Sequence, residues 1–173
     1  MRPHRWWLRS GLILFVALVL QMSLFEDLRI FGAMGDLLLL VTVAAAMVEG
    51  PDRGASYGFV AGLAYDLVLS TPFGLSALVY ALVGYGVGLV GSLLSRPNRW
   101  FPLAVAATAG VAAMALYTGA GHLVGSPFPF GELPGVGFAV AVWNAVLILP
   151  TRALFRRVAR RSEPDRIHLA LGR

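Results

Sequence analysis

The chain has 173 residues, of which 58% are hydrophobic and 13% are charged, about half the charged share of a typical soluble domain. A soluble domain of this length could not bury so much apolar surface in one core, so the composition excludes that class and favours a protein dissolved in a lipid bilayer. The absence of cysteine excludes disulfides, thiolate chemistry and cysteine-based metal sites.

The first apolar segment, at about 8–25, follows the basic stretch "MRPHRWWLR" and therefore has the outline of a signal peptide. The residues that come next, "QMSLFEDL", contain no small-x-small cleavage pattern. We therefore expect this segment to be retained as a first membrane span.

Five further apolar segments follow, at about 36–49, 54–71, 73–95, 101–124 and 135–155. Barrel strands would alternate in polarity, whereas "LLLLVTVAAAM" does not, so helices are predicted. The predicted fold is a single all-α polytopic membrane domain over residues 1–173, with six transmembrane helices and a basic cytoplasmic tail at 156–173. The second and third segments are short for a hydrocarbon core of about 30 Å, unless their tight "EGPDRG" turn dips toward the membrane surface.

The basic residues predict the orientation, because all fourteen of them are arginines. With a cytoplasmic N-terminus and six spans, only Arg29 falls on the outer side. Cytoplasmic loops are enriched in basic residues in this way, so both termini are expected in the cytoplasm. The basic charge is then a topology signal, and no nucleic-acid partner is predicted.

Glycine recurs at every fourth position of the third segment, at Gly54, Gly58 and Gly62, and Asp66 continues the same spacing. Residues four apart are neighbours on a helix, so these positions form one ridge. A ridge without side chains lets another helix backbone approach closely. We therefore predict a packing surface here, either inside the bundle or for a partner helix.

The fourth segment contains a second group of glycines, in the stretch "VGYGVGLVG". This group predicts another close-packed helix face, and its members are Gly84, Gly86, Gly88 and Gly91. Tyr85 lies among them and is expected to be a buried polar residue.

Asp66 is an acidic residue inside an apolar segment, which ends nearby at Pro72 and Gly74. A charge in the bilayer is costly, so the carboxylate must face protein or water and needs hydrogen-bond donors. The candidate donors are the N–H groups that open the fourth segment, the start of the second segment near Asp36, and Arg29. Two roles stay open, a conformational switch or partner-facing site and a structural cap of the next helix. A proton relay is disfavoured, because the other acidic residues lie near the segment ends.

Two further sets of polar residues lie in the last segment and beyond it. Asn144 is expected to form an interhelical hydrogen bond. Four tail arginines could bind anionic lipid headgroups or serve only as a stop-transfer anchor, and these are Arg156, Arg157, Arg160 and Arg161.

No catalytic arrangement is predicted. His4, His122 and His168 fall in separate parts of the predicted topology and cannot jointly bind a metal, and no serine has a plausible base beside it. The sequence therefore predicts neither an enzyme nor a metal or cofactor site.

The run 35–88 resembles the MreD family of rod shape-determining proteins. The family shows a "PDLLL"-like helix start, then "GxxxGLxxD", then "LG", then "GYxxG". Here these fall on Asp36–Leu39, Gly58–Asp66, Phe73–Gly74 and Gly84–Gly88. One departure is Gly35, where a proline is common, and it leaves the start of the second helix less rigid. The size, the six predicted spans and the basic tail also agree.

The resemblance implies a non-enzymatic component of the bacterial cell-elongation complex in the inner (plasma) membrane. It implies that the chain binds the periplasmic scaffold MreC and helps to link the actin-like MreB filament to the peptidoglycan polymerase RodA and its penicillin-binding transpeptidase. The implied fold is similar to the substrate-binding subunits of energy-coupling-factor transporters. The alternative function is therefore a vitamin or metal uptake subunit, although such a subunit needs converging polar groups and the outer half offers few.

Overall fold

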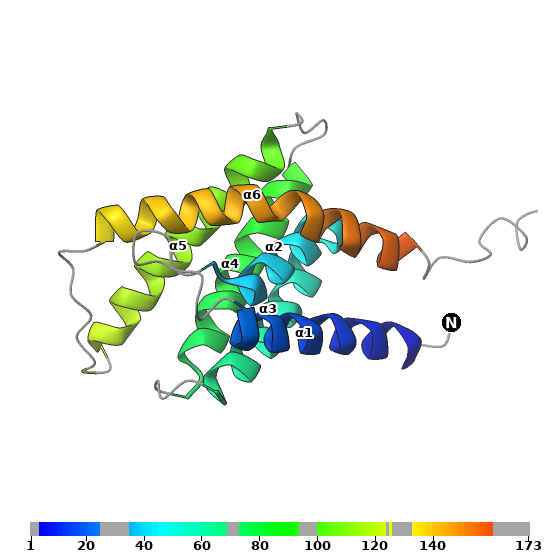
Figure 1. Cartoon of the computed structure of the whole chain (residues 1–173), viewed down its shortest axis with the longest axis horizontal. Coiled ribbons are helices and arrows are strands. Elements are labelled where there is room, and N and C mark those ends of the chain that lie inside the picture. Colours follow the sequence, from blue (N-terminus) through cyan, green and yellow to red (C-terminus); the bar gives the residue numbers. More distant parts are fainter. Residues whose placement is uncertain are drawn as a thin grey trace, which may run out of the picture.

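The computed structural model describes residues 4–24, 35–68, 73–93, 100–123, 125 and 133–160. This part of the chain is helical, which confirms the all-α class (Figure 1). Its six helices are α1 (His4–Leu24), α2 (Leu37–Glu49), α3 (Pro51–Asp66), α4 (Leu75–Leu93), α5 (Phe101–Leu123) and α6 (Leu133–Arg160).

Three of the described helices are long and apolar enough to cross a membrane. They are α4, α5 and the part of α6 from Gly137 to Arg157. The apolar helix α2, with 13 residues, is below the length of a full span, whereas the apolar stretch Gly11–Ser23 belongs to α1, a helix of 21 residues. Three described helices thus have the length and composition of a span, and a multi-pass topology with six spans stays a prediction.

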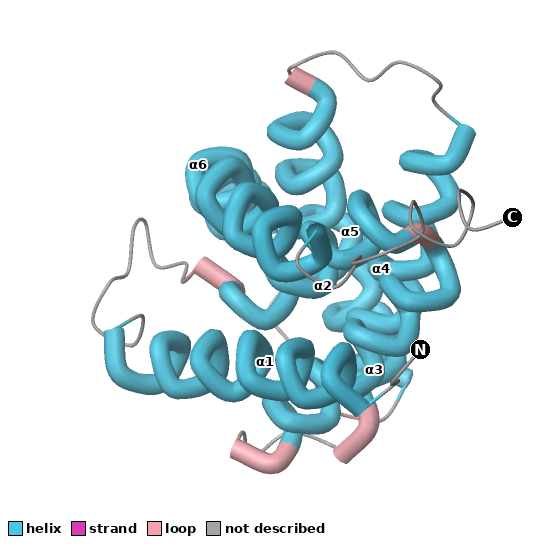
Figure 2. Tube along the Cα trace, turned by 90° about the vertical axis from the view of Figure 1, so that its right-hand side faces the viewer, coloured by secondary structure: helices cyan, strands magenta, loops and turns pink. Residues whose placement is uncertain are grey.

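Helix α2 lies at the centre of the bundle. Figure 2 shows it between α1 and α6, and α3, α4 and α5 also contact it. Its residues from Leu38 to Ala46 are all buried, which is the expected position for a helix that is apolar all round. Three of these side chains, Leu38, Leu39 and Leu40, are among the largest that are fully buried.

A single glycine joins α2 to α3. Gly50 has a φ of 92°, a backbone conformation that side chains rarely adopt, and its N–H donates to the Ala46 carbonyl oxygen at 3.0 Å. Pro51 then starts α3, three residues earlier than the predicted boundary at 54, because proline fits the first turn of a helix without losing a hydrogen bond. The result is a tight reversal that places α3 beside α2.

The two ends of the described chain lie on the same side of the molecule. In Figure 1, the first turn of α1 and the last turn of α6 are both at the right-hand end. Helices α1 and α6 therefore run in opposite directions on either side of α2. This arrangement is consistent with termini on one side of a membrane.

Candidate functional site

Asp66 caps the start of α4 from the end of α3. Its carboxylate accepts hydrogen bonds from the backbone N–H groups of Gly74 at 2.9 Å, Ser76 at 3.2 Å and Ala77 at 3.3 Å. Asp66 is 4% exposed, so these donors replace water around the carboxylate. An acidic group at this place also interacts favourably with the helix dipole.

The sequence around Gly74 explains why a remote cap is present. The Gly74 carbonyl accepts from the N–H of Leu78 at 3.0 Å, so Gly74 occupies the position where a capping side chain normally sits. With a φ of 94°, this position favours glycine, which has no side chain to offer. Asp66 supplies the missing oxygen atoms across the turn. Pro72 lies outside the described residues.

A second carboxylate, Asp36, caps α2 and at the same time contacts α4. One of its oxygen atoms accepts from the N–H of Leu39 at 2.9 Å, and the other accepts from the hydroxyl of Tyr80. Tyr80 lies one turn beyond Ser76 in α4, so the two carboxylates are at the same end of the bundle. The ring of Tyr65, next to Asp66, stacks on Tyr80 with centroids 6.2 Å apart.

The side chain of Gln21 connects α1 to the start of α2, at the same end of the bundle as the two carboxylates. Its side-chain oxygen accepts from the N–H of Leu37 at 2.8 Å, and its side-chain nitrogen donates to the carbonyl of Gly35 at 3.0 Å. Gln21 is 3% exposed, so one buried amide links α1 to the start of α2. We refer to Gln21, Asp36, Tyr65, Asp66 and Tyr80 together as the polar end of the bundle.

The glycines of the ridge lie where α3 meets α4. A side chain at Gly58 would collide with the backbone of Tyr80, and one at Gly62 would collide with the backbone of Ala77. At Gly54, an ideal Cβ would lie 2.6 Å from the Gly84 carbonyl oxygen. The ridge therefore packs inside the bundle, and α4 occupies its groove.

Only half of the α4 glycines take part in this packing. Gly84 faces Gly54, and an ideal Cβ at Gly88 would lie 2.5 Å from the Pro51 backbone. We call Gly54, Gly58, Gly62, Gly84 and Gly88 the glycine seam.

The remaining α4 positions correct the prediction of one continuous close-packed face. Gly86 and Gly91 have no neighbouring atom within 4 Å of an ideal Cβ. The expectation that Tyr85 is buried is wrong, because its side chain is 47% exposed. Successive residues are about 100° apart around a helix, so Tyr85 and Gly86 point away from α3. Gly91 is on the same face as Gly84 but lies beyond the contact between Gly88 and Pro51, the first residue of α3.

Asn144 lies between α6 and α5. Its side chain is 1% exposed and packs against Gly110, where an added Cβ would collide with the amide nitrogen. The amide oxygen has no hydrogen-bond partner among the described residues. The sequence contained the signal for Asn144 as a buried polar group, but the pairing with Gly110 depends on how the two helices pack.

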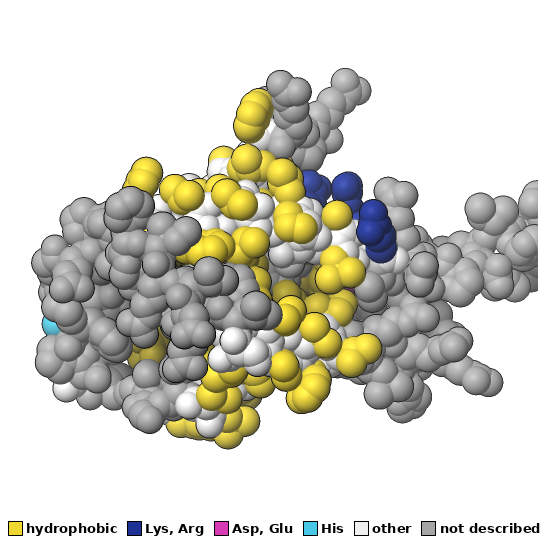
Figure 3. Space-filling view, in the orientation of Figure 1, with side chains coloured by type: hydrophobic (Ala, Val, Ile, Leu, Met, Phe, Trp, Pro, Cys, Tyr) yellow, Lys and Arg dark blue, Asp and Glu magenta, His cyan; other side chains and the backbone are white. Residues whose placement is uncertain are grey.

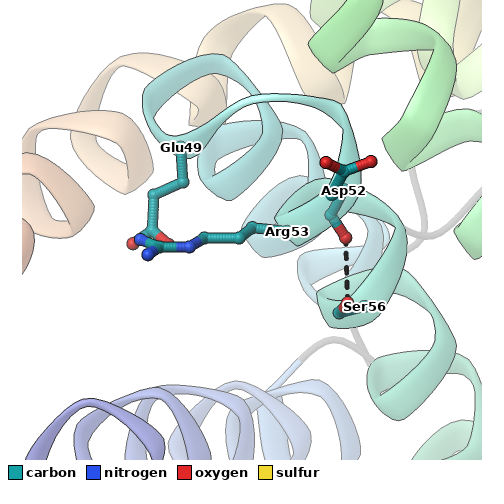
Figure 4. A network of polar contacts seen from close by, with 4 residues as sticks. All are labelled: Glu49, Asp52, Arg53 and Ser56. Carbon is teal, nitrogen blue, oxygen red and sulfur yellow. Dashed lines mark hydrogen bonds and ion pairs between the residues drawn. The ribbon is translucent and has the colours of Figure 1, made fainter. Parts of the chain in front are cut away.

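The opposite end of the bundle contains the α2–α3 turn and basic residues. Figure 4 shows Glu49 and Arg53 pointing toward each other, and their side chains form an ion pair at 3.1 Å. The hydroxyl of Ser56 donates to the Asp52 carbonyl oxygen at 2.8 Å, within α3.

The predicted basic tail begins inside α6. Arg156 and Arg157 are exposed, α6 ends at Arg160, and Arg161 lies outside the described residues. Basic side chains gather at this end of the face seen in Figure 3. No group of three potential metal ligands occurs among the residues that the structure describes. The described residues therefore cap helices, pack two helices closely and place basic side chains at one end of the bundle.

Comparison with known proteins gives one match. The family model described as rod shape-determining protein MreD matches residues 2–158. No curated protein and no solved structure matches the chain.

Proposed function

The chain belongs to the MreD family of rod shape-determining proteins, and from this membership we propose that it is a non-enzymatic membrane component of the cell-elongation complex. In this proposal it binds MreC and so helps to connect MreB with RodA and its penicillin-binding transpeptidase. The match over residues 2–158 carries the proposal, because it spans every described helix almost completely. The likeness to energy-coupling-factor subunits stays a prediction.

The partner surface should lie on a helix face that the bundle leaves open. The glycine seam is filled by the chain's own helices, so it does not offer a groove to another protein. The outward face of α4 is different, because Leu78, Leu82, Tyr85 and Leu89 are all exposed. These positions are three or four residues apart and form one stripe.

Tyr85 is the one residue of these four that carries a polar group, and contact with lipid alone does not account for a hydroxyl at this position. It lies near the middle of α4, about 15 Å from the start of the helix and about 12 Å from its end at 1.5 Å per residue. Tyrosine usually sits at the membrane interface, where its hydroxyl reaches water. A hydroxyl facing hydrocarbon at mid-depth lacks partners, whereas a helix of MreC packed on this face could supply one. We therefore propose that MreC contacts the outward face of α4.

Replacing Tyr85 by leucine should reduce the amount of MreC that co-purifies with the tagged chain by several-fold. The substitution removes both the aromatic ring and the hydroxyl, and a lost hydrogen bond is worth about 0.5–1.5 kcal/mol. The measurement is recovery of MreC from detergent-solubilised membranes, normalised to membrane abundance. The control is Phe138→Leu, which trims an exposed aromatic residue on α6.

The outcomes test separately whether the chain binds MreC and whether MreC contacts the outward face of α4. If wild-type protein does not recover MreC at all, the proposed partnership is wrong. If wild type and Tyr85→Leu recover it equally, MreC binds elsewhere and the α4 assignment is wrong.

The proposed topology has six spans and both termini in the cytoplasm. The basic residues support it, because cytoplasmic segments are enriched in arginine. Single cysteines introduced at Arg29, Glu132 and Arg161 can be probed with an impermeant thiol reagent, since the chain has no cysteine of its own. In intact cells we expect labelling at Arg29→Cys and Glu132→Cys, and protection at Arg161→Cys. Permeabilised cells should label all three, and labelling of Arg161→Cys before permeabilisation would refute the topology.

A further inference from the structure

The exposed face of α6 combines an apolar stripe with a basic end. Phe138, Val142, Val146 and Leu149 are exposed and follow each other at intervals of three or four residues. Continuing this spacing through residue 153 leads to Arg156, which is also exposed. Figure 3 shows hydrophobic side chains along α6 and basic side chains where it ends. One helix face therefore passes from apolar to cationic.

Arg152 lies beside the end of this stripe, one turn before Arg156. Its side chain is half-buried, and its Nε atom is buried without a hydrogen-bond partner. Arg156 repels it electrostatically. The ion pair between Glu49 and Arg53 is formed elsewhere, and among the described residues no acidic side chain pairs with Arg152 or Arg156. Two like charges one turn apart on a helix destabilise it slightly, and an anion between them removes that repulsion.

We propose that this face of α6 binds one anionic phospholipid, with the lipid phosphate held between Arg152 and Arg156 and an acyl chain along Leu149, Val146 and Val142. Guanidinium groups match phosphate oxygens in geometry as well as in charge. The helix rises about 15 Å from Val142 to Arg152, which is half of a hydrocarbon core of about 30 Å. The stripe therefore has the depth of one bilayer leaflet, which favours a lipid over free phosphate.

The ligand specificity can be measured on the purified full-length protein in detergent by native mass spectrometry. The probes are phosphatidylglycerol, phosphatidylcholine with the same acyl chains, and inorganic phosphate. We expect one phosphatidylglycerol to bind more tightly than phosphatidylcholine, and no retention of phosphate. Retention of phosphate alone, or equal binding of the two lipids, would overturn the proposal.

Two single substitutions that each remove one positive charge, Arg152→Gln and Arg53→Gln, test whether the site is local, and the double variant of Arg152 and Arg156 measures the combined effect. Replacing Arg152 and Arg156 by glutamine should weaken phosphatidylglycerol binding by about twenty-five-fold, at about fivefold for each basic residue near an anionic headgroup. Arg53→Gln removes a charge at the same end, where Glu49 already neutralises it, and should change binding less than twofold. A general attraction to the basic end predicts that Arg53→Gln weakens binding as much as Arg152→Gln does, and that outcome contradicts a defined site.

Two further variants control for misfolding of the double glutamine variant and for a protein, in place of a lipid, on this face. Arg156→Gln changes only an exposed side chain, so its fivefold loss can be measured even if the double variant does not purify. The double lysine variant keeps both charges and should retain most of the binding. If the double glutamine variant still binds lipid but no longer recovers MreC, this face contacts protein and the lipid site is wrong.

Discussion

Gly58→Ala should destabilise the bundle by about 1–3 kcal/mol, and Gly58→Leu should prevent stable assembly. The reason is that a Cβ at this position would collide with the carbonyl group of Tyr80. A backbone atom cannot move aside as the end of a flexible side chain can, so α3 and α4 must separate. Thermal unfolding of the purified protein and its abundance in membranes both report the effect.

Gly86→Ala is the matched control for this prediction. Both glycines lie within helices, so both substitutions gain up to about 1 kcal/mol of helix propensity. Gly86 has no neighbour within 4 Å of an ideal Cβ, so only the substitution at Gly58 meets an obstacle. Gly86→Ala should be neutral or stabilising. Equal stability of the two variants would show that α3 and α4 do not pack as closely as the glycine seam requires.

The sequence was sufficient to predict the helices and one of their packing faces. The apolar segments are separated by polar or proline-containing stretches, and glycines spaced by four mark a ridge whatever the partner is. The orientation of α4 about its own axis could not be predicted in the same way. In a membrane helix, residues that face lipid are as apolar as residues that face protein, so hydropathy does not distinguish the exposed Leu82 from the buried Val83.

At the polar end, the sequence allowed a prediction only for contacts between residues that are close together along the chain. Asp36 directly precedes an apolar run, which is a common signal for a helix cap. The donors of Asp66 could be listed in advance, because the connection to α4 is short and its first N–H groups lack helical partners. The contacts of Asp36 with Tyr80 and of Gln21 with Gly35 join different helices, at 44 and 14 residues of separation. Such pairs follow from the packing of the whole bundle, which no single segment specifies.

Replacing Asp66 by leucine should impair rod shape, whereas asparagine should be partly tolerated. We propose that Asp66 acts as a structural clamp that holds the start of α4 against the end of α3. Leucine leaves the N–H groups of Gly74, Ser76 and Ala77 without their acceptor, and each unpaired buried donor costs about 1–3 kcal/mol.

Asparagine keeps one acceptor oxygen. The Asp66 oxygen that serves Gly74 and Ala77 can be retained, while the new amide group faces the N–H of Ser76 and loses that single bond. A titrating role predicts a different order, because neither asparagine nor leucine can carry a proton to and from a partner. The measurement is cell width in a depletion strain complemented by each variant at matched membrane abundance.

Asp52 provides the control, because it is an exposed aspartate in the first turn of α3 and its side chain caps no other helix in the described structure. Asp52→Leu should leave cell width unchanged, since an exposed charge near a helix start contributes about 0.3–1 kcal/mol. Graded widths, with wild type close to Asp66→Asn and well below Asp66→Leu, support the clamp. If asparagine widens cells as much as leucine does, the charge or its titration matters more than the three hydrogen bonds. If neither variant changes cell width, the cap is dispensable and α4 is held in place by the glycine seam alone.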